Sequence, residues 1–120
     1  MVKAEVRKRK DHEEYWFEEG CWITEVANDG GDEGLSVAIA RVEPGSSTKW
    51  HRLEGVAERY IIASGTGRVQ IGGLDQGVER GDVVRIPANT RQRITNTGDE
   101  DLLFYVVCTP PFTRACYSSF

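Results

Sequence analysis

The stretch KWHRLEGVAERYIIASG, residues 49–65, gathers three side chains that can do chemistry: His51, Glu58 and Tyr60. Imidazole and carboxylate groups bind divalent metals, and all three side-chain types can transfer protons in enzymes. The other histidine, His12, stands in a charged N-terminal stretch that is typical of a surface. We therefore expect the chemistry of this chain to centre on residues 49–65.

The elements that must position these side chains are short β-strands. No segment keeps a helical period, and thirteen glycines interrupt the chain, many of them in turns such as SGTG, ERGD and NTGDED. Many short strands with frequent turns predict an antiparallel all-β sandwich or barrel. Strands are expected as two short runs within residues 13–27 and then at 35–43, 48–52, 57–63, 67–71, 83–86, 91–96 and 102–108.

Alternation along these strands sorts the side chains into two faces. Neighbouring side chains of a strand point in opposite directions, so residues two apart share a face. In a barrel, the shared inner faces would combine polar groups with apolar neighbours, which is the usual composition of a small-molecule pocket. The residues expected on these faces are His51 with Leu53, Glu58 with Tyr60, and Gln92 with Ile94.

Two spaced motifs resemble those of the cupin family. Gly45, His51, Glu58 and Gly65 fit the first family motif, G(X)5HXH(X)3–4E(X)6G, and residues 81–96 fit the second, G(X)5PXG(X)2H(X)3N. The resemblance implies a single-domain double-stranded β-helix, a jelly-roll barrel open at one end. It also implies one domain over residues 1–120, with a conserved core at about 35–108 and an irregular C-terminal segment at 109–120.

The resemblance implies a metal site with a reduced set of ligands. Of the family's four ligand positions, His51 and Glu58 keep the expected residue, whereas Leu53 and Gln92 replace histidines, and Asn89 replaces the glycine of the second motif. A divalent ion (Mn, Zn, Fe or Ni) on His51, Glu58 and Gln92 is one prediction, although an amide oxygen is a weak neutral ligand. The alternative is a metal-free network in which Glu58 and His51 hydrogen-bond each other and Gln92 joins them.

Three readings of the chain remain open. The first is a metal-dependent isomerase, lyase or oxygenase, with Leu53, Tyr60 and Ile94 lining the substrate pocket and Tyr60 as the candidate acid. The second is a metal-free module that binds a sugar-like or carboxylate ligand, and the third is a dimeric structural or regulatory protein. The stretch ERYIIASGTGRV also resembles the sugar-phosphate isomerase branch of the cupins, but the histidine-rich segment that precedes it there is missing.

Composition narrows the partners. A net charge of −4 disfavours a nucleic-acid surface. No apolar run reaches the roughly 20 residues that span a bilayer, and no secretory signal is recognised, so a cytoplasmic location is expected. Cupins are commonly homodimers, and Trp50 and Arg52 are expected to cover the outer sheet or a partner subunit. Cys21 and Cys108 are expected to be buried, and Cys116 is a candidate for the surface.

Overall fold

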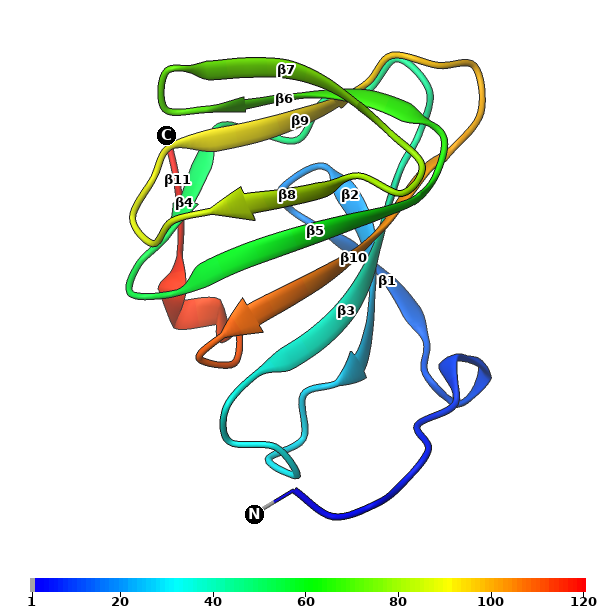
Figure 1. Ribbon diagram of the computed structural model, residues 1–120, viewed down its shortest axis with the longest axis vertical. Helices are drawn as coiled ribbons and strands as arrows, with labels where there is room; N and C mark the ends of the chain where they lie inside the picture. The colour runs from blue at the N-terminus through cyan, green and yellow to red at the C-terminus, as the bar shows by residue number, and fades with distance from the viewer. Residues whose placement is uncertain (1) are drawn as a thin grey trace.

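Alternation of buried and exposed side chains along short segments produces two antiparallel β-sheets that face each other (Figure 1). The structure is a computed structural model, and it describes residues 2–120. The predicted all-β jelly-roll barrel is confirmed. Among residues 2–120, no helix is long and apolar enough to cross a membrane.

The larger sheet has six strands and begins at the N-terminal hairpin. Its order is β1-β2-β3-β10-β5-β8, so β3 and β10 separate the N-terminal hairpin from β5, which carries the second half of the first motif. The strands in that order are β1 (Glu14–Phe17), β2 (Cys21–Ala27), β3 (Ser36–Val42), β10 (Leu102–Thr109), β5 (Ala57–Ser64) and β8 (Val83–Ile86).

The smaller sheet has five strands in the order β11-β4-β9-β6-β7. In Figure 1 its end strand β11, drawn in red, lies beside β4. Short 3-10 turns precede β1 (η1, Arg9–Asp11) and β11 (η2, Arg114–Cys116). The strands are β11 (Tyr117–Ser119), β4 (His51–Leu53), β9 (Gln92–Asn96), β6 (Thr66–Ile71) and β7 (Leu74–Glu79).

Three details differ from the expected elements. No strand was expected between residues 71 and 83, but only Gly72 and Gly73 turn the chain after β6, and β7 then pairs with β6. Strand β7 was hidden because its side chains are mostly polar and exposed, so it lacks an apolar alternation. The segment 109–120, expected to be irregular, ends in β11. Cys116, a candidate for the surface, is buried, as are the other two free cysteines.

The core fills the space between the two sheets. Val42, Ile94 and Leu102 have no exposed surface, and Ile62 and Ile86 are nearly as buried. These side chains occupy the inward positions of β3, β9, β10, β5 and β8, which is what period-two alternation requires. Truncating any of them would be expected to cost roughly 2–5 kcal/mol.

The glycines of the two motifs occupy turns that need a left-handed backbone. Gly45, Gly65 and Gly81 have φ angles of 76°, 90° and 92°. At Gly65, a Cβ atom would also lie 2.7 Å from the carbonyl oxygen of Asp101, so a side chain is excluded. Asn89, which stands where the family motif has glycine, adopts φ 65° as well, a conformation that asparagine tolerates. This departure from the motif therefore leaves the turn intact.

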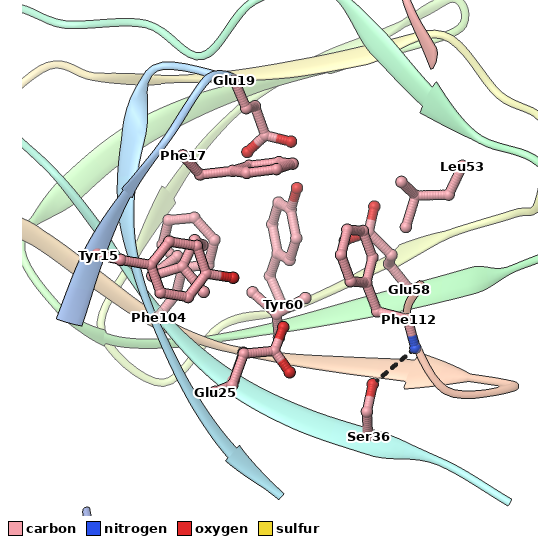
Figure 2. Close-up of a pocket in the computed structure, with 14 residues that line it drawn as sticks. Tyr15, Phe17, Glu19, Glu25, Ser36, Leu53, Glu58, Tyr60, Phe104 and Phe112 are labelled. Carbon is pink, nitrogen blue, oxygen red and sulfur yellow. Dashed lines mark hydrogen bonds between the residues drawn. The ribbon is translucent and has the colours of Figure 1, made fainter. Parts of the chain in front are cut away.

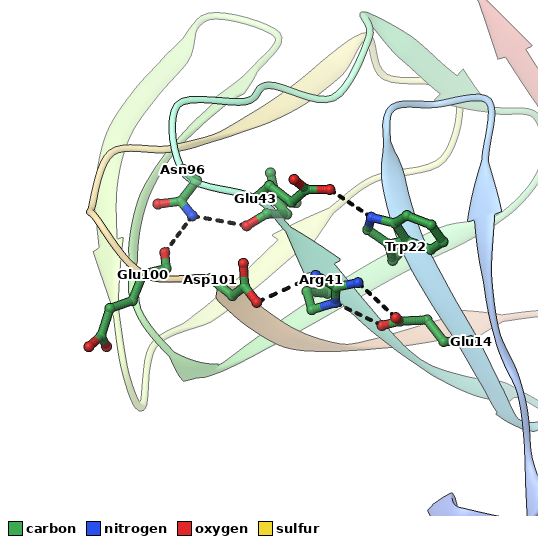
Figure 3. Close-up of polar contacts among 8 residues, drawn as sticks. Glu14, Trp22, Arg41, Glu43, Asn96, Glu100 and Asp101 are labelled. Atoms are coloured by element: carbon green, nitrogen blue, oxygen red, sulfur yellow. Dashed lines mark hydrogen bonds and ion pairs between the residues drawn. The ribbon is translucent and has the colours of Figure 1, made fainter.

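The outer face of β3 carries a paired charge cluster (Figure 3). The guanidinium of Arg41 donates two hydrogen bonds to Glu14, at 2.8 and 3.0 Å, and lies 3.4 Å from Asp101. Nearby, buried Asn96 donates to the carbonyls of Val42 and Glu100 at 2.9 and 2.7 Å. Asn96, the last residue of the second motif, therefore connects β3 to the loop that precedes β10.

Candidate functional site

A pocket opens on the inner side of the six-stranded sheet and is walled largely by aromatic rings (Figure 2). The space that can hold the centre of a water molecule is about 40 Å³, which is room for a few waters or one small group. Its aromatic wall consists of Tyr15, Phe17, Tyr60, Phe104 and Phe112. The segments involved are β1, β5, β10 and the chain that follows β10.

Three glutamates also line the pocket. Glu58 comes from β5, Glu25 from β2, and Glu19 from the turn between β1 and β2. In the view of Figure 2, the carboxylates of Glu19 and Glu25 lie on either side of Tyr60. Among the described residues that line the pocket, there is no lysine or arginine. The wall is thus apolar with an acidic polar component.

A buried hydrogen-bonded chain connects three of the side chains expected from the sequence. The hydroxyl of Tyr60 donates to Oε1 of Gln92 at 2.9 Å, and Nε2 of Gln92 donates to Oε1 of Glu58 at 2.7 Å. All three residues are less than 7% exposed. Both ends of the Gln92 amide are therefore in use, and the Glu58 carboxyl is held in one orientation.

Burial sets the protonation states of Glu58 and Tyr60 in this hydrogen-bonded network. It raises the pKa of Glu58 to about 7, with a further increase from the charge of Glu19, while His51 and Gln92 act in the opposite direction. Burial, aided by the nearby Glu58, also raises the pKa of Tyr60 well above 10. At neutral pH, Tyr60 thus keeps its proton, and Glu58 is present in both protonation states.

His51 lies behind the pocket wall and is directed toward Glu19. Its Nδ1 donates to the carbonyl of Lys49 at 2.6 Å, and Nε2 lies 2.9 Å from Oε1 of Glu19, close enough for an ion pair. The ring stacks on Tyr117 of β11, with 5.5 Å between centroids. Burial lowers the pKa of His51, but the Glu19 carboxylate and the Lys49 carbonyl outweigh it, so the pKa is raised above 6.5.

The structure places the remaining predicted residues as follows. Leu53 and Tyr60 line the pocket, whereas Ile94 lies in the fully buried core and is not part of the lining. Gln92 pairs with His51 across β4 and β9 and supports the wall from behind. Outside the barrel, Trp50 lies against two guanidinium groups, those of Arg91 at 3.7 Å and Arg93 at 4.4 Å from its ring centroid.

Several pocket residues were missed at the level of sequence. Glu19, Glu25 and Phe112 lie outside both motifs, and Tyr15 and Phe17 belong to an N-terminal hairpin that the motifs do not reach. A usable signal was present for two of them, because Tyr15 and Phe17 alternate along β1 and so share one face. Phe112 is held by its backbone amide, which donates to Ser36 at 2.9 Å, and that contact could not be read from local sequence.

The donors only partly fit the metal site expected from the sequence. Nε2 of His51 is buried, and its 2.9 Å contact with the Glu19 carboxylate is not aligned as a hydrogen bond, so its lone pair is a candidate for a metal ion. However, Gln92 is committed at both ends of its amide, and Glu19 lies in front of the imidazole. Within the same residues, no three His, Cys, Asp or Glu side chains converge as a metal site. The arrangement is therefore not a ready three-ligand centre.

Comparison with known families agrees with the fold and the motifs. The family model described as "Cupin domain" matches residues 38–108, more than half of the 120-residue chain. The chain therefore belongs to the cupin family. The matched region covers β3 to β10, and it excludes both the N-terminal hairpin and the C-terminal segment that close the pocket.

Individual relatives span different chemistries. An uncharacterised protein of Methanocaldococcus jannaschii is 30% identical over 95% of this chain and 90% of its own length. An oxalate-binding protein of Thermotoga maritima is 37% identical, over 58% of each chain. The structure of a nucleoside dehydratase from Streptomyces superposes with a TM-score of 0.81 over 98% of this chain and 92% of its own. At 16% identity, that last likeness concerns the fold alone.

Proposed function

We propose that this cupin binds a small polar molecule in the pocket of Figure 2 and exchanges a proton with it at Glu58, as an isomerase- or lyase-type enzyme. The observation that carries the proposal is the buried chain from Tyr60 through Gln92 to Glu58, which ends in the pocket wall. A carboxyl group held in one orientation at the edge of a substrate pocket is suited to general acid–base catalysis.

Each member of the chain has a distinct part in this proposal. Oε1 of Glu58 accepts from Gln92, while Oε2 has one hydrogen-bond contact within residues 2–120, the thiol of Cys108 at 4.0 Å. Oε2 is therefore the atom left to exchange a proton with a ligand. Because the Tyr60 proton is directed at Gln92, Tyr60 acts here as a positioning residue. The pKa of Glu58, about 7, lets it give or take a proton near neutral pH.

Deuterium exchange tests this function. A panel of small carbonyl compounds, hydroxy compounds and amino compounds would be incubated with the protein in D2O, and mass spectrometry would detect deuterium on carbon. We expect Glu58→Gln to slow the exchange of an active compound by about 100-fold or more, because the base is removed while its shape is kept. The control, Glu79→Gln, removes an equal charge at an exposed position of β7 and should leave the rate unchanged. Equal rates for Glu58→Gln and the unaltered chain would contradict the proposal.

A divalent ion on His51, Glu58 and Gln92 remains the second candidate, favoured by the buried Nε2 of His51, whose 2.9 Å contact with Glu19 is not aligned as a hydrogen bond. The ion would use the second lone pair of Oε1 of Gln92, beside the hydrogen bond from Tyr60. Elemental analysis of untagged protein, beside a His51→Ala variant, measures it. About one ion per chain that the variant loses would support this site. No retained ion after reloading with manganese, zinc or iron would contradict it.

The expected homodimer and cytoplasmic location also stay predictions. Light scattering coupled to size exclusion measures the first, with a mass near 13.4 kDa identifying a monomer.

A further inference from the structure

We propose that the pocket selects a small organic cation, a protonated amine or a quaternary ammonium compound. This inference rests on the proposed function, because it names the class of molecule that the same pocket takes. It is carried by two features of the wall: a carboxylate without a cationic partner, that of Glu25, and aromatic rings.

Summed over the lining residues alone, the charge of the wall is negative near neutral pH; the Arg114 guanidinium, whose charge acts on Tyr15, lies outside that lining. Glu19 and Glu25 face the pocket together with Glu58. If His51 is protonated, it offsets Glu19, which lies 2.9 Å away. Even if Glu58 is neutral as well, Glu25 remains. A free anion would therefore meet repulsion, whereas a cation would gain a counter-charge.

Glu25 is the carboxylate most available to a ligand. Within residues 2–120, it makes no hydrogen bond or ion pair, and it is half-buried on β2. A half-buried carboxylate without a partner is unfavourable unless a ligand or water satisfies it. This sets Glu25 apart from Glu19, which faces His51, and from Glu58, which accepts from Gln92.

The aromatic wall adds a second attraction for a cation. Tyr15, Phe17, Phe104 and Phe112 border the same space as the carboxylates (Figure 2). The face of an aromatic ring attracts a cation within about 6 Å of its centroid, and the attraction grows when the cation is desolvated. The guanidinium of Arg114 already lies 5.3 Å from the centroid of the Phe17 ring, outside the pocket lining, so this part of the molecule accommodates a cation.

These features discriminate among the ligands considered from the sequence. A free carboxylate, such as the oxalate named for one relative, is disfavoured by three glutamates that no lysine or arginine of the described lining balances. A neutral sugar-like molecule could donate hydrogen bonds to Glu25 but would gain nothing from its charge. A small cation uses the carboxylates and the rings together.

Matched pairs of charged and neutral probes test the selection. Choline and 3,3-dimethylbutan-1-ol have nearly the same shape and differ in charge. Isopropylammonium and propan-2-ol form a second pair of the same kind. Binding to the full chain would be followed by chemical shifts of backbone amides in β2 and β5, with oxalate as the anionic probe. We expect the cation of at least one pair to bind at least about tenfold more tightly than its neutral counterpart.

Variants locate the effect. Glu25→Gln should abolish most of the preference for the cation, because it removes the carboxylate that has no other partner. Glu79→Gln, with the same change in net charge on β7, should preserve it. Equal binding of cation and neutral probe in both pairs, tighter binding of oxalate, or no binding of either cation would overturn the inference. The deuterium-exchange test does not depend on ligand charge, so the proposed function would be judged separately.

Discussion

The two faces of β3 meet carboxylates in opposite ways. On the outer face, Arg41 binds Glu14 through two hydrogen bonds and lies 3.4 Å from Asp101 (Figure 3). On the inner face, the pocket beside β3 contains Glu19, Glu25 and Glu58, with no lysine or arginine among its described lining residues. The two regions lie on opposite faces of the same strand, so the contrast is one of partners and burial.

The contrast appears in the pKa values. The hydrogen bond from Arg41 lowers the pKa of Glu14, so the outer carboxylate favours its charged form. Burial raises the pKa of Glu58 to about 7, so the inner carboxylate disfavours its charged form. At neutral pH, the charge of Glu14 therefore raises the free energy of unfolding, whereas the charge of Glu58 lowers it. Groups that are perturbed in this second way are common at functional sites.

The largest expected effect comes from neutralising Glu58. Between pH 4.5 and 7, the folded chain binds more protons at this carboxyl than the unfolded chain does, so the free energy of unfolding falls as the pH rises. A rise in pKa from 4.5 to about 7 corresponds to roughly 3 kcal/mol once the pH exceeds both values. We expect Glu58→Gln to stabilise the chain by up to that amount at pH 8, measured by urea unfolding, and to have little effect at pH 4. An equal change at both pH values would show that charge burial is not the cause.

The second effect has the opposite sign and comes from a polar side chain whose partners are complete. Asn96 donates to the carbonyls of Val42 and Glu100 and accepts from the amide of Gly98 at 2.9 Å. Asn96→Ala would leave these groups without partners, and we expect the free energy of unfolding to fall by roughly 2 kcal/mol.

Asn28 provides the control for this prediction, since its side chain makes an exposed hydrogen bond to the carbonyl of Phe112. Because water can replace that bond, Asn28→Ala should cost less than Asn96→Ala in the same urea titration. Equal losses from the two variants would mean that the buried contacts of Asn96 carry no special weight.

Much of the fold could be predicted because its turns have local chemical requirements. Gly65 and Gly81 occupy left-handed conformations, and Asn89 tolerates one. The spacing of these residues was therefore enough to predict where the turns lie. Alternation placed Glu58 and Tyr60 on one inner face. Strand β7 was not predicted, because an exposed edge strand needs no apolar face and so shows no alternation.

Much less of the site could be predicted, because long-range packing assembles it. Glu19 lies beside His51 because the first hairpin folds back over the barrel. Phe112 is held at the pocket by a hydrogen bond from its backbone amide to Ser36, 76 residues earlier in the chain. No local pattern encodes either contact. The predicted bond between His51 and Glu58 is replaced by one partner for each, Glu19 and Gln92.

The smallest expected effect belongs to Glu14 on the outer face. The pKa of Glu14 is lowered in the folded chain, so its contribution to stability is present above the unfolded value of 4.5 and is lost as the pH falls through the folded value. The pair is partly exposed, with about a quarter of each side chain in contact with solvent, so we expect Glu14→Gln to cost only about 0.5 kcal/mol at pH 7 in low salt. Urea unfolding at pH 7 and pH 3 measures the difference, which should shrink at the lower pH and in 1 M salt.

Glu79→Gln, which breaks no ion pair within residues 2–120, is the matched control. If Glu14→Gln and Glu58→Gln changed stability with the same sign at neutral pH, the contrast between the two faces of β3 would not hold.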